Sequence, residues 1–340
     1  MRLGILTGGG DCPGLNAAIR SVVRHTHGRY AGEVLGFRDG WQGVLEGHAE
    51  AITPKDVRGL LPRGGTILGT SGMQPFRQPG GVERVREVIA MHRLDGFVVI
   101  GGEGTMGACA RMPDVPVVGI PKTIDNDIGG TDVSIGFQSA VQIATDLIDR
   151  LYSTAESHHR VMVCEVMGRS AGWIGLSAGL AGNGDVILIP ERPFDMGQVA
   201  RRLERIHLEH RAFSIVVVSE GAVPVPGTME VPDYPLDANG WPRLGGIGSL
   251  VAAEIEARTG FETRITVLGH VQRGGSPVAA DRVLATLLGE AAVDQAAQGA
   301  WGCLVGQRGE QMVPTPLAEV GGEPRTVPES RWRIPQVLCE

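Results

Sequence analysis

The segment PKTIDND, residues 121–127, places two carboxylates two residues apart directly after an apolar run of strand length. A hydroxyl that accepts a phosphoryl group needs a carboxylate within hydrogen-bond reach to take its proton, and a second carboxylate can bind a metal ion. Asp125 and Asp127 are therefore predicted to be catalytic, with a structural role in an Asp-rich turn as the alternative. Lys122 either contacts the transferred phosphate or is simply exposed.

Two glycine-rich loops could hold the phosphates of a donor. Residues 7–14, TGGGDCPG, and residues 101–105, GGEGT, each join an apolar run to a helical pattern. Glycine lets backbone N–H groups approach a phosphate closely, and a helix N-terminus adds a favourable partial charge. Glu103 can hold a Mg²⁺ ion that bridges phosphate oxygens. The first loop matches neither GxGxxG nor GxxxxGK[ST], so taken alone a tight structural turn explains it equally well.

Cationic side chains follow several of the apolar runs. They are Arg160, Arg169, Arg264, His270 and Arg273. Arginine binds phosphate through two parallel hydrogen bonds, which makes these residues candidates for holding a phosphorylated substrate. Such a local cluster is needed because the formal net charge of the chain is -7. The alternative is that each arginine is merely solvated.

The elements that must position these residues are short apolar runs without polar alternation, which predict strands buried on both faces. The runs are 3–6, 97–100, 115–120, 161–166, 186–189, 215–218 and 265–268. Helical patterns lie between them, most clearly at 139–152, where apolar residues follow the i, i+3, i+4, i+7 spacing. This alternation predicts a parallel α/β fold, whose ligands bind beyond the carboxyl ends of the strands. Residues 223–243 and the Pro-rich tail after Met312 are expected to be surface excursions.

The composition limits the class of protein. A chain of 340 residues with 42% hydrophobic content can bury one or two ordinary cores, and we expect two domains. The negative net charge argues against binding to nucleic acid or to an anionic membrane. Five cysteines, an odd number without a CxxC pair, indicate a reducing compartment. No run reaches the ~18 apolar residues that span a bilayer, so we expect a cytoplasmic protein.

A set of segments, taken in order, resembles the signature of the phosphofructokinase family. The segments are LTGGGDCPGLNAAIR, GGTILGT, VVIGGEGT, PKTIDND, SHHR, EVMGR, SEGA and TVLGHVQRGGSPVAADR. The resemblance implies two similar three-layer α/β domains with mainly parallel sheets and an active site in the cleft between them. The expected ranges are 1–125 plus about 270–305 for the donor-binding domain, 126–269 for the fructose 6-phosphate-binding domain, and 306–340 for a C-terminal tail.

The same resemblance implies a glycolytic 6-phosphofructokinase, which phosphorylates the 1-hydroxyl of D-fructose 6-phosphate with ATP and Mg²⁺. Asp125 would be the base and Arg169 the transition-state cation, assisted by Thr123 and Asp127. The implied donor-binding residues are Gly9, Gly10, Gly72, Arg77, Gly102, Glu103, Gly104 and Thr105, and the implied metal ligands are Glu103 and Asp127. The implied substrate-binding residues are Thr123, Ile124, Asp125, Arg160, Met167, Gly168, Arg169, Glu220, Arg264, His270, Val271, Gln272 and Arg273.

Two further implications concern assembly and nucleotide binding. In the family, the residues that match Arg160 and Arg264 come from a neighbouring subunit, which implies a homotetramer or homodimer with shared active sites. Gly72 stands where many members carry an arginine that touches the donor, which leaves Arg77 as the nearest candidate. Trp41 stands where relatives often have tyrosine, so it either stacks on adenine or belongs to a core.

The identity of the donor depends on two positions that disagree. Gly104 leaves room for a nucleotide where pyrophosphate-dependent relatives place aspartate, whereas Lys122 resembles those pyrophosphate-dependent relatives. The pair is similar to an actinobacterial group that mixes ATP-dependent and pyrophosphate-dependent enzymes. We predict ATP, with pyrophosphate as the alternative. An NAD-kinase-like or lipid-kinase-like enzyme is a remote alternative, because it leaves PKTIDND, EVMGR and GHVQRGGSP unexplained. A dehydrogenase is a remote alternative because the first loop lacks GxGxxG and an acid about 20 residues further on. A nucleotide sensor is one because it would have lost the base, whereas Asp125 is present.

Overall fold

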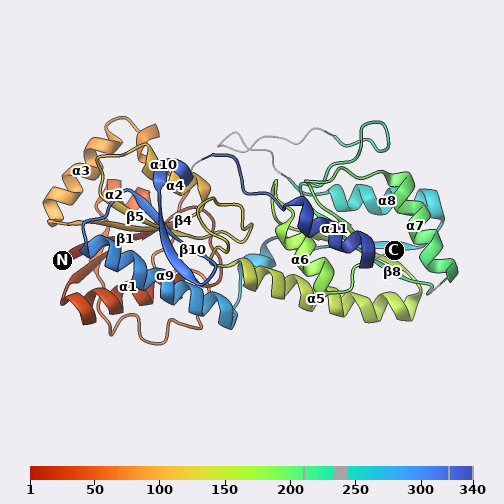
Figure 1. The fold of residues 1–340 in the computed structure, drawn as a ribbon, viewed down its shortest axis with the longest axis horizontal. Helices are drawn as coiled ribbons and strands as arrows, with labels where there is room; N and C mark the ends of the chain where they lie inside the picture. The colour runs from red at the N-terminus through yellow and green to blue at the C-terminus, as the bar shows by residue number, and fades with distance from the viewer. Residues whose placement is uncertain (210, 233–243, 321, 339–340) are drawn as a thin grey trace. The chain divides into compact units, whose positions relative to one another are not determined.

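The structure is a computed structural model that describes residues 1–209, 211–232, 244–320 and 322–338. The chain divides into two compact units. Unit 1 comprises Met1–Ser139 and Arg273–Pro324, and unit 2 comprises Ala140–Gln272 and Arg325–Glu340. Each unit is built around its own mainly parallel sheet, labelled in Figure 1. This confirms the predicted α/β fold with two mainly parallel sheets.

Unit 1 contains a seven-stranded sheet in the order β11-β10-β5-β4-β1-β2-β3. The strands are β1 (Arg2–Thr7), β2 (Glu33–Phe37), β3 (Ala49–Ala51), β4 (Gly96–Gly101), β5 (Val117–Pro121), β10 (Cys303–Arg308) and β11 (Gln311–Pro316). The central strands are parallel, and only the β2–β3 and β10–β11 pairs are antiparallel. The carboxyl ends of β1, β4 and β5 therefore meet at one edge of this sheet.

Helices cover both faces of the unit 1 sheet. They are α1 (Leu15–Tyr30), α2 (Trp41–Glu46), α3 (Gly81–His92), α4 (Glu103–Ala110), α9 (Ala279–Ala297) and α10 (Leu317–Val320), with a 3-10 turn, η1 (Pro75–Arg77). Helices α1 and α9 pack against each other on one face, and α2, α3, α4 and α10 lie on the other, as Figure 1 shows. The second face buries an aliphatic core with few aromatic side chains, among them Phe37, Trp41 and Phe97.

Unit 2 contains a four-stranded, fully parallel sheet in the order β7-β8-β6-β9. Its strands are β6 (Val161–Val166), β7 (Val186–Leu188), β8 (Ser214–Ser219) and β9 (Thr263–Val267). Its helices are α5 (Phe137–His158), which enters from unit 1, α6 (Trp173–Ala181), α7 (Met196–Glu209), α8 (Ile247–Thr259) and α11 (Glu329–Leu338), with a 3-10 turn, η2 (Gly269–Arg273). Helices α7 and α8 bury one face of the sheet in an apolar core, and α6 packs on β7 and β8.

The predicted strands and the predicted helix at 139–152 are all present, as β1, β4 to β9 and α5. The expectation that the tail after Met312 is a surface excursion is wrong, because this segment forms β11 and pairs with β10 from Cys303 to Arg308. The two prolines of β11 argued against a strand in the sequence, yet proline is tolerated in a strand at the edge of a sheet. Most of the other expected excursion, 233–243, lies outside the described residues.

The ranges of the two units differ from the sequence-based segmentation at three places, one of which is that Arg325–Glu340 belongs to unit 2 and not to a separate tail. Residues 126–139 belong to unit 1, where the carboxylate of Asp281 accepts hydrogen bonds from the amides of Gly136 (3.0 Å) and Ser139 (2.7 Å). Residues 306–324 also belong to unit 1, through β11 and α10. In the described residues, no helix is long and apolar enough to cross a membrane.

Candidate active site

The first glycine-rich loop, between β1 and α1, contacts side chains from distant parts of unit 1. Lys122 Nζ donates a hydrogen bond to the carbonyl oxygen of Gly10, and Arg273 Nη1 donates one to the carbonyl oxygen of Asp11 (3.2 Å). A Cβ atom at Gly10 would lie 2.7 Å from Arg273 Nη1, so only glycine leaves room for this guanidinium group. Lys122 and Arg273 thus bring two cationic groups to a loop predicted to hold phosphates.

Lys122 is almost fully buried, with 4% of its surface exposed. Burial lowers the pKa of its ammonium group, and the charge of Arg273 lowers it further, while Cys12 and Asp125 act in the opposite direction. A Cβ atom at Gly9 would lie 3.6 Å from Lys122 Nζ. The alternative of an exposed Lys122 is therefore wrong, and its ammonium group lies inside the loop.

The second glycine-rich loop leads from β4 into α4. Gly102 precedes the helix, Glu103 is its first residue and is half-buried, and Thr105 is buried against Gly8. Gly104 is exposed, and a Cβ atom there would meet one heavy atom within 4 Å, Gln74 Nε2 at 3.7 Å. The side of α4 at Gly104 therefore has open space next to it.

The segment that carries Gln74 lies beside α4. Gln74 Nε2 donates a hydrogen bond to the carbonyl oxygen of Gly104 (3.3 Å), and Gln74 Oε1 is a buried acceptor without a partner in the described chain. Gly72 and Arg77, the two predicted donor-binding residues of this segment, are both exposed. Nothing in the local sequence distinguishes Gln74, so this contact could not have been predicted.

The acidic loop after β5 is rigidly built. The amide of Asp125 donates a hydrogen bond to Thr123 Oγ1 (3.1 Å), and Asn126, at φ +54°, accepts one from the amide of Ser134 (3.0 Å) through Oδ1. Asp125 is 4% exposed, and within the described residues its Oδ1 has no hydrogen-bond partner. Because a buried oxygen without a donor is unfavourable, this atom is suited to accept a proton or a hydroxyl hydrogen bond from a ligand. Ile124 beside it is fully buried.

The predicted metal ligands follow two neighbouring strands. Glu103 comes directly after β4 and Asp127 comes after β5, and these strands pair in parallel with Gly101 opposite Pro121. Both carboxylates are half-buried. Among the described residues, no group of three or more His, Cys, Asp or Glu side chains could hold a metal on its own. Two carboxylates after neighbouring strands are a donor set of the kind that Mg²⁺ takes, because this ion commonly binds one or two protein carboxylates and completes its shell with phosphate oxygens and water.

In unit 2, the loop between β6 and α6 is held by Glu220, which follows β8. Oε1 of Glu220 accepts hydrogen bonds from the amides of Gly168 (3.3 Å) and Arg169 (3.0 Å). Gly168 has φ +144° and Arg169 has φ +51°, a left-handed conformation that is uncommon for arginine. Met167 is half-buried, and the side chain of Arg169 is exposed. Glu220 thus fixes the backbone that presents the Arg169 guanidinium group.

The turn η2 follows β9, so it begins at the same edge of the unit 2 sheet as the Met167–Arg169 loop. His270 and Val271 are exposed, whereas Gln272 is fully buried. Gln272 Nε2 donates a hydrogen bond to the carbonyl oxygen of Gly269 (3.0 Å), and its Oε1 is a buried acceptor without a partner in the described residues. Arg273, the last residue of the turn, is half-buried.

Arg160 and Arg264 lie at the amino ends of the unit 2 strands, opposite to the ends that carry Arg169 and His270. Arg160 precedes β6, and Arg264 is opposite Met162 near the amino end of β9. Both guanidinium groups bind the carboxylate of Glu262, at 2.7 Å for Arg160. The hydrogen bond from Arg160 lowers the pKa of Glu262. Since β6 is six residues long, its amino end is about 16 Å from Arg169 along the strand.

Nothing in the sequence distinguished Glu262 from the other exposed acidic residues.

The structure decides between the two roles predicted for Trp41, because this residue is 1% exposed and its ring packs on Phe97 at a centroid distance of 5.6 Å. It therefore belongs to the core, and the alternative role of stacking on adenine is wrong. The four described cysteines are all buried and free, and the fifth, Cys339, lies outside the described residues.

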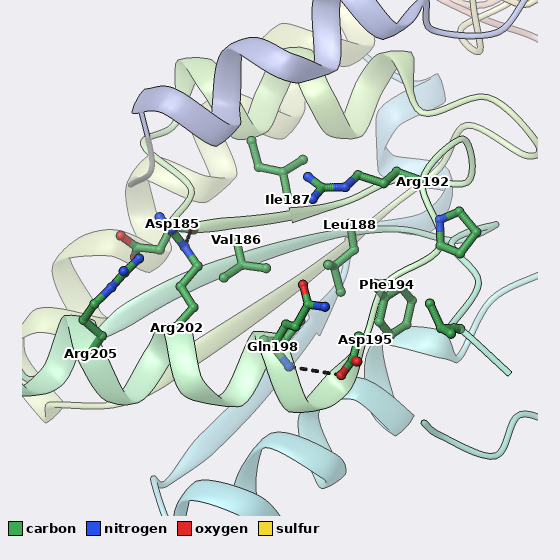
Figure 2. A pocket seen from close by; sticks show the side chains of 13 residues that line it. Asp185, Val186, Ile187, Leu188, Arg192, Phe194, Asp195, Gln198, Arg202 and Arg205 are labelled. Carbon is green, nitrogen blue, oxygen red and sulfur yellow. Dashed lines mark hydrogen bonds between the residues drawn. The ribbon is translucent and has the colours of Figure 1, made fainter. Parts of the chain in front are cut away.

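A cavity of about 470 Å³ lies along the edge strand β7 and helix α7 in unit 2, and Figure 2 shows its lining. Arg192, Arg202 and Arg205 contribute to its wall. The Asp185 carboxylate of this wall pairs with Arg211. None of the residues predicted to take part in catalysis lines this cavity.

Known proteins with similar sequences are phosphoryl-transfer enzymes. A family model described as Phosphofructokinase matches residues 2–296. The pyrophosphate–fructose 6-phosphate 1-phosphotransferase of Amycolatopsis methanolica is 52% identical over 340 residues, which cover 99% of both chains. The ATP-dependent 6-phosphofructokinase of Mycobacterium leprae is 48% identical over 335 residues, which cover 98% of both chains.

A similar fold is found in the crystal structure of Pichia pastoris phosphofructokinase in the T-state. The TM-score is 0.83 at 32% sequence identity. The alignment covers 94% of this chain and 35% of the Pichia pastoris chain, so this chain spans about a third of that protein.

Proposed function

The chain belongs to the phosphofructokinase family and is a fructose 6-phosphate 1-phosphotransferase, and we propose that it transfers the terminal phosphoryl group of ATP. The observation that carries the choice of ATP is the exposed position of Gly104, whose missing side chain adds neither bulk nor negative charge against the rest of a nucleotide. The adjacent N-terminus of α4, reached through Gly102, suits donor phosphates because its backbone N–H groups are not used within the helix.

In the proposed reaction, Asp125 takes the proton of the 1-hydroxyl of fructose 6-phosphate. The hydroxyl oxygen then bonds to the terminal phosphorus of ATP, the bond from that phosphorus to the bridging oxygen breaks, and ADP leaves. The buried, unpartnered Oδ1 of Asp125 supports its role as the base. The guanidinium group of Arg169 stabilises the negative charge that develops on the transferred group.

Mg²⁺ is the proposed metal, with Glu103 and Asp127 as its protein ligands. When bound, it neutralises charge on the donor phosphates. The protein's own part is to place the two carboxylates after neighbouring strands and to line the donor loop with Lys122 and Arg273. Gly9 and Gly10 of the first glycine-rich loop and Thr105 of the second are also proposed to bind the donor. Gly72 and Arg77, in the segment that carries Gln74, are proposed to do the same.

Pyrophosphate is the second candidate donor, and two observations favour it. The relatives with the higher identities, 50% to 52%, are pyrophosphate-dependent by name, and the ATP-dependent relatives reach 45% to 48%. The buried ammonium group of Lys122 also lies where it can bind a compact, highly charged donor. It does not exclude ATP, however, because a lysine near phosphates attracts both donors.

The active enzyme is proposed to be a cytoplasmic homo-oligomer, a tetramer or a dimer. Arg160 and Arg264 are proposed to bind the 6-phosphate of a substrate held mainly by the neighbouring subunit. Arg160 and Arg264 lie where strands β6 and β9 begin, whereas Arg169 follows the end of β6. This supports the proposal, because β6 is about 16 Å long and a single sugar phosphate does not extend across that length. His270 and Arg273 are proposed to bind the same phosphate from the subunit that contributes Asp125.

The test of the donor is the ratio of kcat/KM values for Mg·ATP and Mg·pyrophosphate with fructose 6-phosphate as acceptor. A preference for ATP of at least about tenfold, equivalent to about 1.4 kcal/mol in transition-state binding, is expected. A preference of similar size for pyrophosphate would overturn the choice of ATP and leave the acceptor reaction unchanged.

A further inference from the structure

The loop from Met167 to Gly172, which presents Arg169, is held at both ends by carboxylates from other strands. Glu220 binds the amides at its start, as described above. At its end, both oxygens of Glu191 accept hydrogen bonds from the amide of Gly172, each at 3.0 Å. Glu191 follows β7, so this carboxylate lies at the N-terminus of α6, where the helix dipole favours a negative charge.

The backbone at Gly172 is packed closely against the residues that follow β7. A Cβ atom at Gly172 would lie 2.6 Å from Ile189 Cγ2 and 2.7 Å from Glu191 Oε2. At the other end, a Cβ atom at Gly168 would lie 2.5 Å from the carbonyl oxygen of Ala171. The loop is therefore compact, and its shape depends on the two carboxylates that bind its amides.

The C-terminal segment shares Glu191 with this loop. Oε1 of Glu191 also accepts a hydrogen bond from the amide of Val327 (2.8 Å), whose side chain is 3% exposed. The indole Nε1–H of Trp173, the first residue of α6, donates a hydrogen bond to the carbonyl oxygen of Arg325 (2.9 Å). The Arg325 guanidinium group lies 4.2 Å from the centroid of the same indole ring. The segment from Arg325 to Val327 thus contacts both Glu191 and the first residue of α6, next to the end of the loop.

We propose that Glu191 is a positioning residue for Arg169 and that the docked C-terminal segment, through Val327 and Trp173, holds Glu191 in place. This inference rests on the proposed function, in which Arg169 stabilises the transition state. Glu191 itself does not touch the substrate. It acts by keeping the amide of Gly172, and with it the short loop, in the conformation that directs the Arg169 guanidinium group.

The first measurement is the steady-state kinetics of Glu191→Ala and Glu191→Gln in the full-length chain. A displaced catalytic cation affects the transition state more than substrate binding, so we expect kcat to fall about 100-fold for alanine while KM for fructose 6-phosphate changes less than about threefold. Glutamine keeps one acceptor oxygen and should lose about tenfold. Trp173→Phe, which removes the hydrogen bond to Arg325 and weakens the contact of the Arg325 guanidinium group with the ring, should also lower kcat.

The second measurement separates positioning from a general structural effect. If Glu191 acts through Arg169, the double variant Glu191→Ala with Arg169→Ala should be no slower than Arg169→Ala alone. Amide hydrogen exchange of the peptide that spans residues 167–173 should accelerate about tenfold in Glu191→Ala and in Trp173→Phe. Asp195→Asn is the matched control, because this nearby carboxylate accepts a hydrogen bond from the amide of Gln198 (3.1 Å) at the start of α7.

The outcomes distinguish the two proposals. Full activity of Arg169→Ala would contradict the proposed role of Arg169, whereas the exchange data would still decide whether Glu191 holds the loop. Unchanged exchange in Glu191→Ala, or additive losses in the double variant, would overturn the positioning role even if Arg169→Ala is inactive. An equal loss of kcat in Asp195→Asn would show that any carboxylate of this region is needed for folding, which also overturns it.

Discussion

The ammonium group of Lys122 donates a hydrogen bond to the carbonyl oxygen of Gly10, which joins the end of β5 to the loop after β1. This relationship puts a buried cation into a loop that is proposed to bind the donor phosphates. Because burial lowers the pKa of Lys122, its charge is lost at a lower pH than that of an exposed lysine. The protonation state of Lys122 is therefore expected to affect binding of the donor in the proposed site.

A pH dependence of donor binding follows from this arrangement. The charged ammonium group attracts donor phosphates, and raising the pH through its lowered pKa removes that attraction. We expect the KM for the donor to rise with pH, at a lower pH than the titration of an exposed lysine would give, and to rise less in Lys122→Met, in which it starts higher. The KM for fructose 6-phosphate is the internal control. The same rise in Lys122→Met would assign the pH effect to another group.

Asp125→Asn should separate activity from stability. Removing a general base is expected to lower kcat by about 10²-fold to 10⁴-fold. The free energy of unfolding should be unchanged or higher, because the neutral amide is easier to bury than a carboxylate whose Oδ1 has no partner in the described chain. Urea denaturation and steady-state kinetics measure the two effects. Asp114→Asn, at an exposed carboxylate that pairs with Arg86, should retain full activity.

Gly104→Asp tests the basis of donor choice. A carboxylate at this exposed position should lower kcat/KM for Mg·ATP by about 100-fold through like-charge repulsion and lost space, with a smaller effect on Mg·pyrophosphate. Gly104→Ala is the matched control, since a Cβ atom there lies 3.7 Å from its nearest neighbour and should cost little. An equal loss in both variants would indicate that backbone freedom, rather than charge, matters here.

Mixed oligomers should report whether sites are shared. Asp125→Asn and Arg160→Ala subunits are each expected to be nearly inactive alone. After they are unfolded and refolded together, some sites combine an intact Asp125 with an intact Arg160 from the other subunit, and activity should return to a substantial fraction. A mixture of Asp125→Asn and Arg169→Ala subunits should stay inactive, since both residues serve one site in the same chain. Recovery in the second mixture, or none in the first, contradicts this division.

Asp281→Asn should destabilise unit 1. The carboxylate of Asp281 is fully buried and accepts hydrogen bonds from the amides of Gly136 and Ser139 and from the Ser139 hydroxyl (2.6 Å). An asparagine NH₂ group would face one of these donors, so we expect a loss of about 1 to 3 kcal/mol in the free energy of unfolding. Asp146→Asn, on the exposed surface of α5, should change it by less than about 0.5 kcal/mol.

The sequence alone was sufficient to identify the strands whose following loops carry the proposed site residues. Apolar runs without alternation marked the buried parallel strands, and the residues that follow them, such as Glu103, Asp125 and Arg169, were readable because a strand end and its loop are adjacent in the chain. Strands β2 and β10 and the edge strands β3 and β11 were not predicted, because they are short, contain glycine or proline, or lack a continuous apolar run.

The partnerships between distant residues were decided only by the tertiary structure. Lys122 with Gly10, Gln74 with Gly104, and Glu191 with Gly172 each join segments that are far apart in sequence or belong to different strands. The ion pairs of Glu262 with Arg160 and Arg264 depend on the register of β6 with β9. Such contacts are fixed by how strands are ordered and helices packed, and local patterns of residue type carry no information about that order.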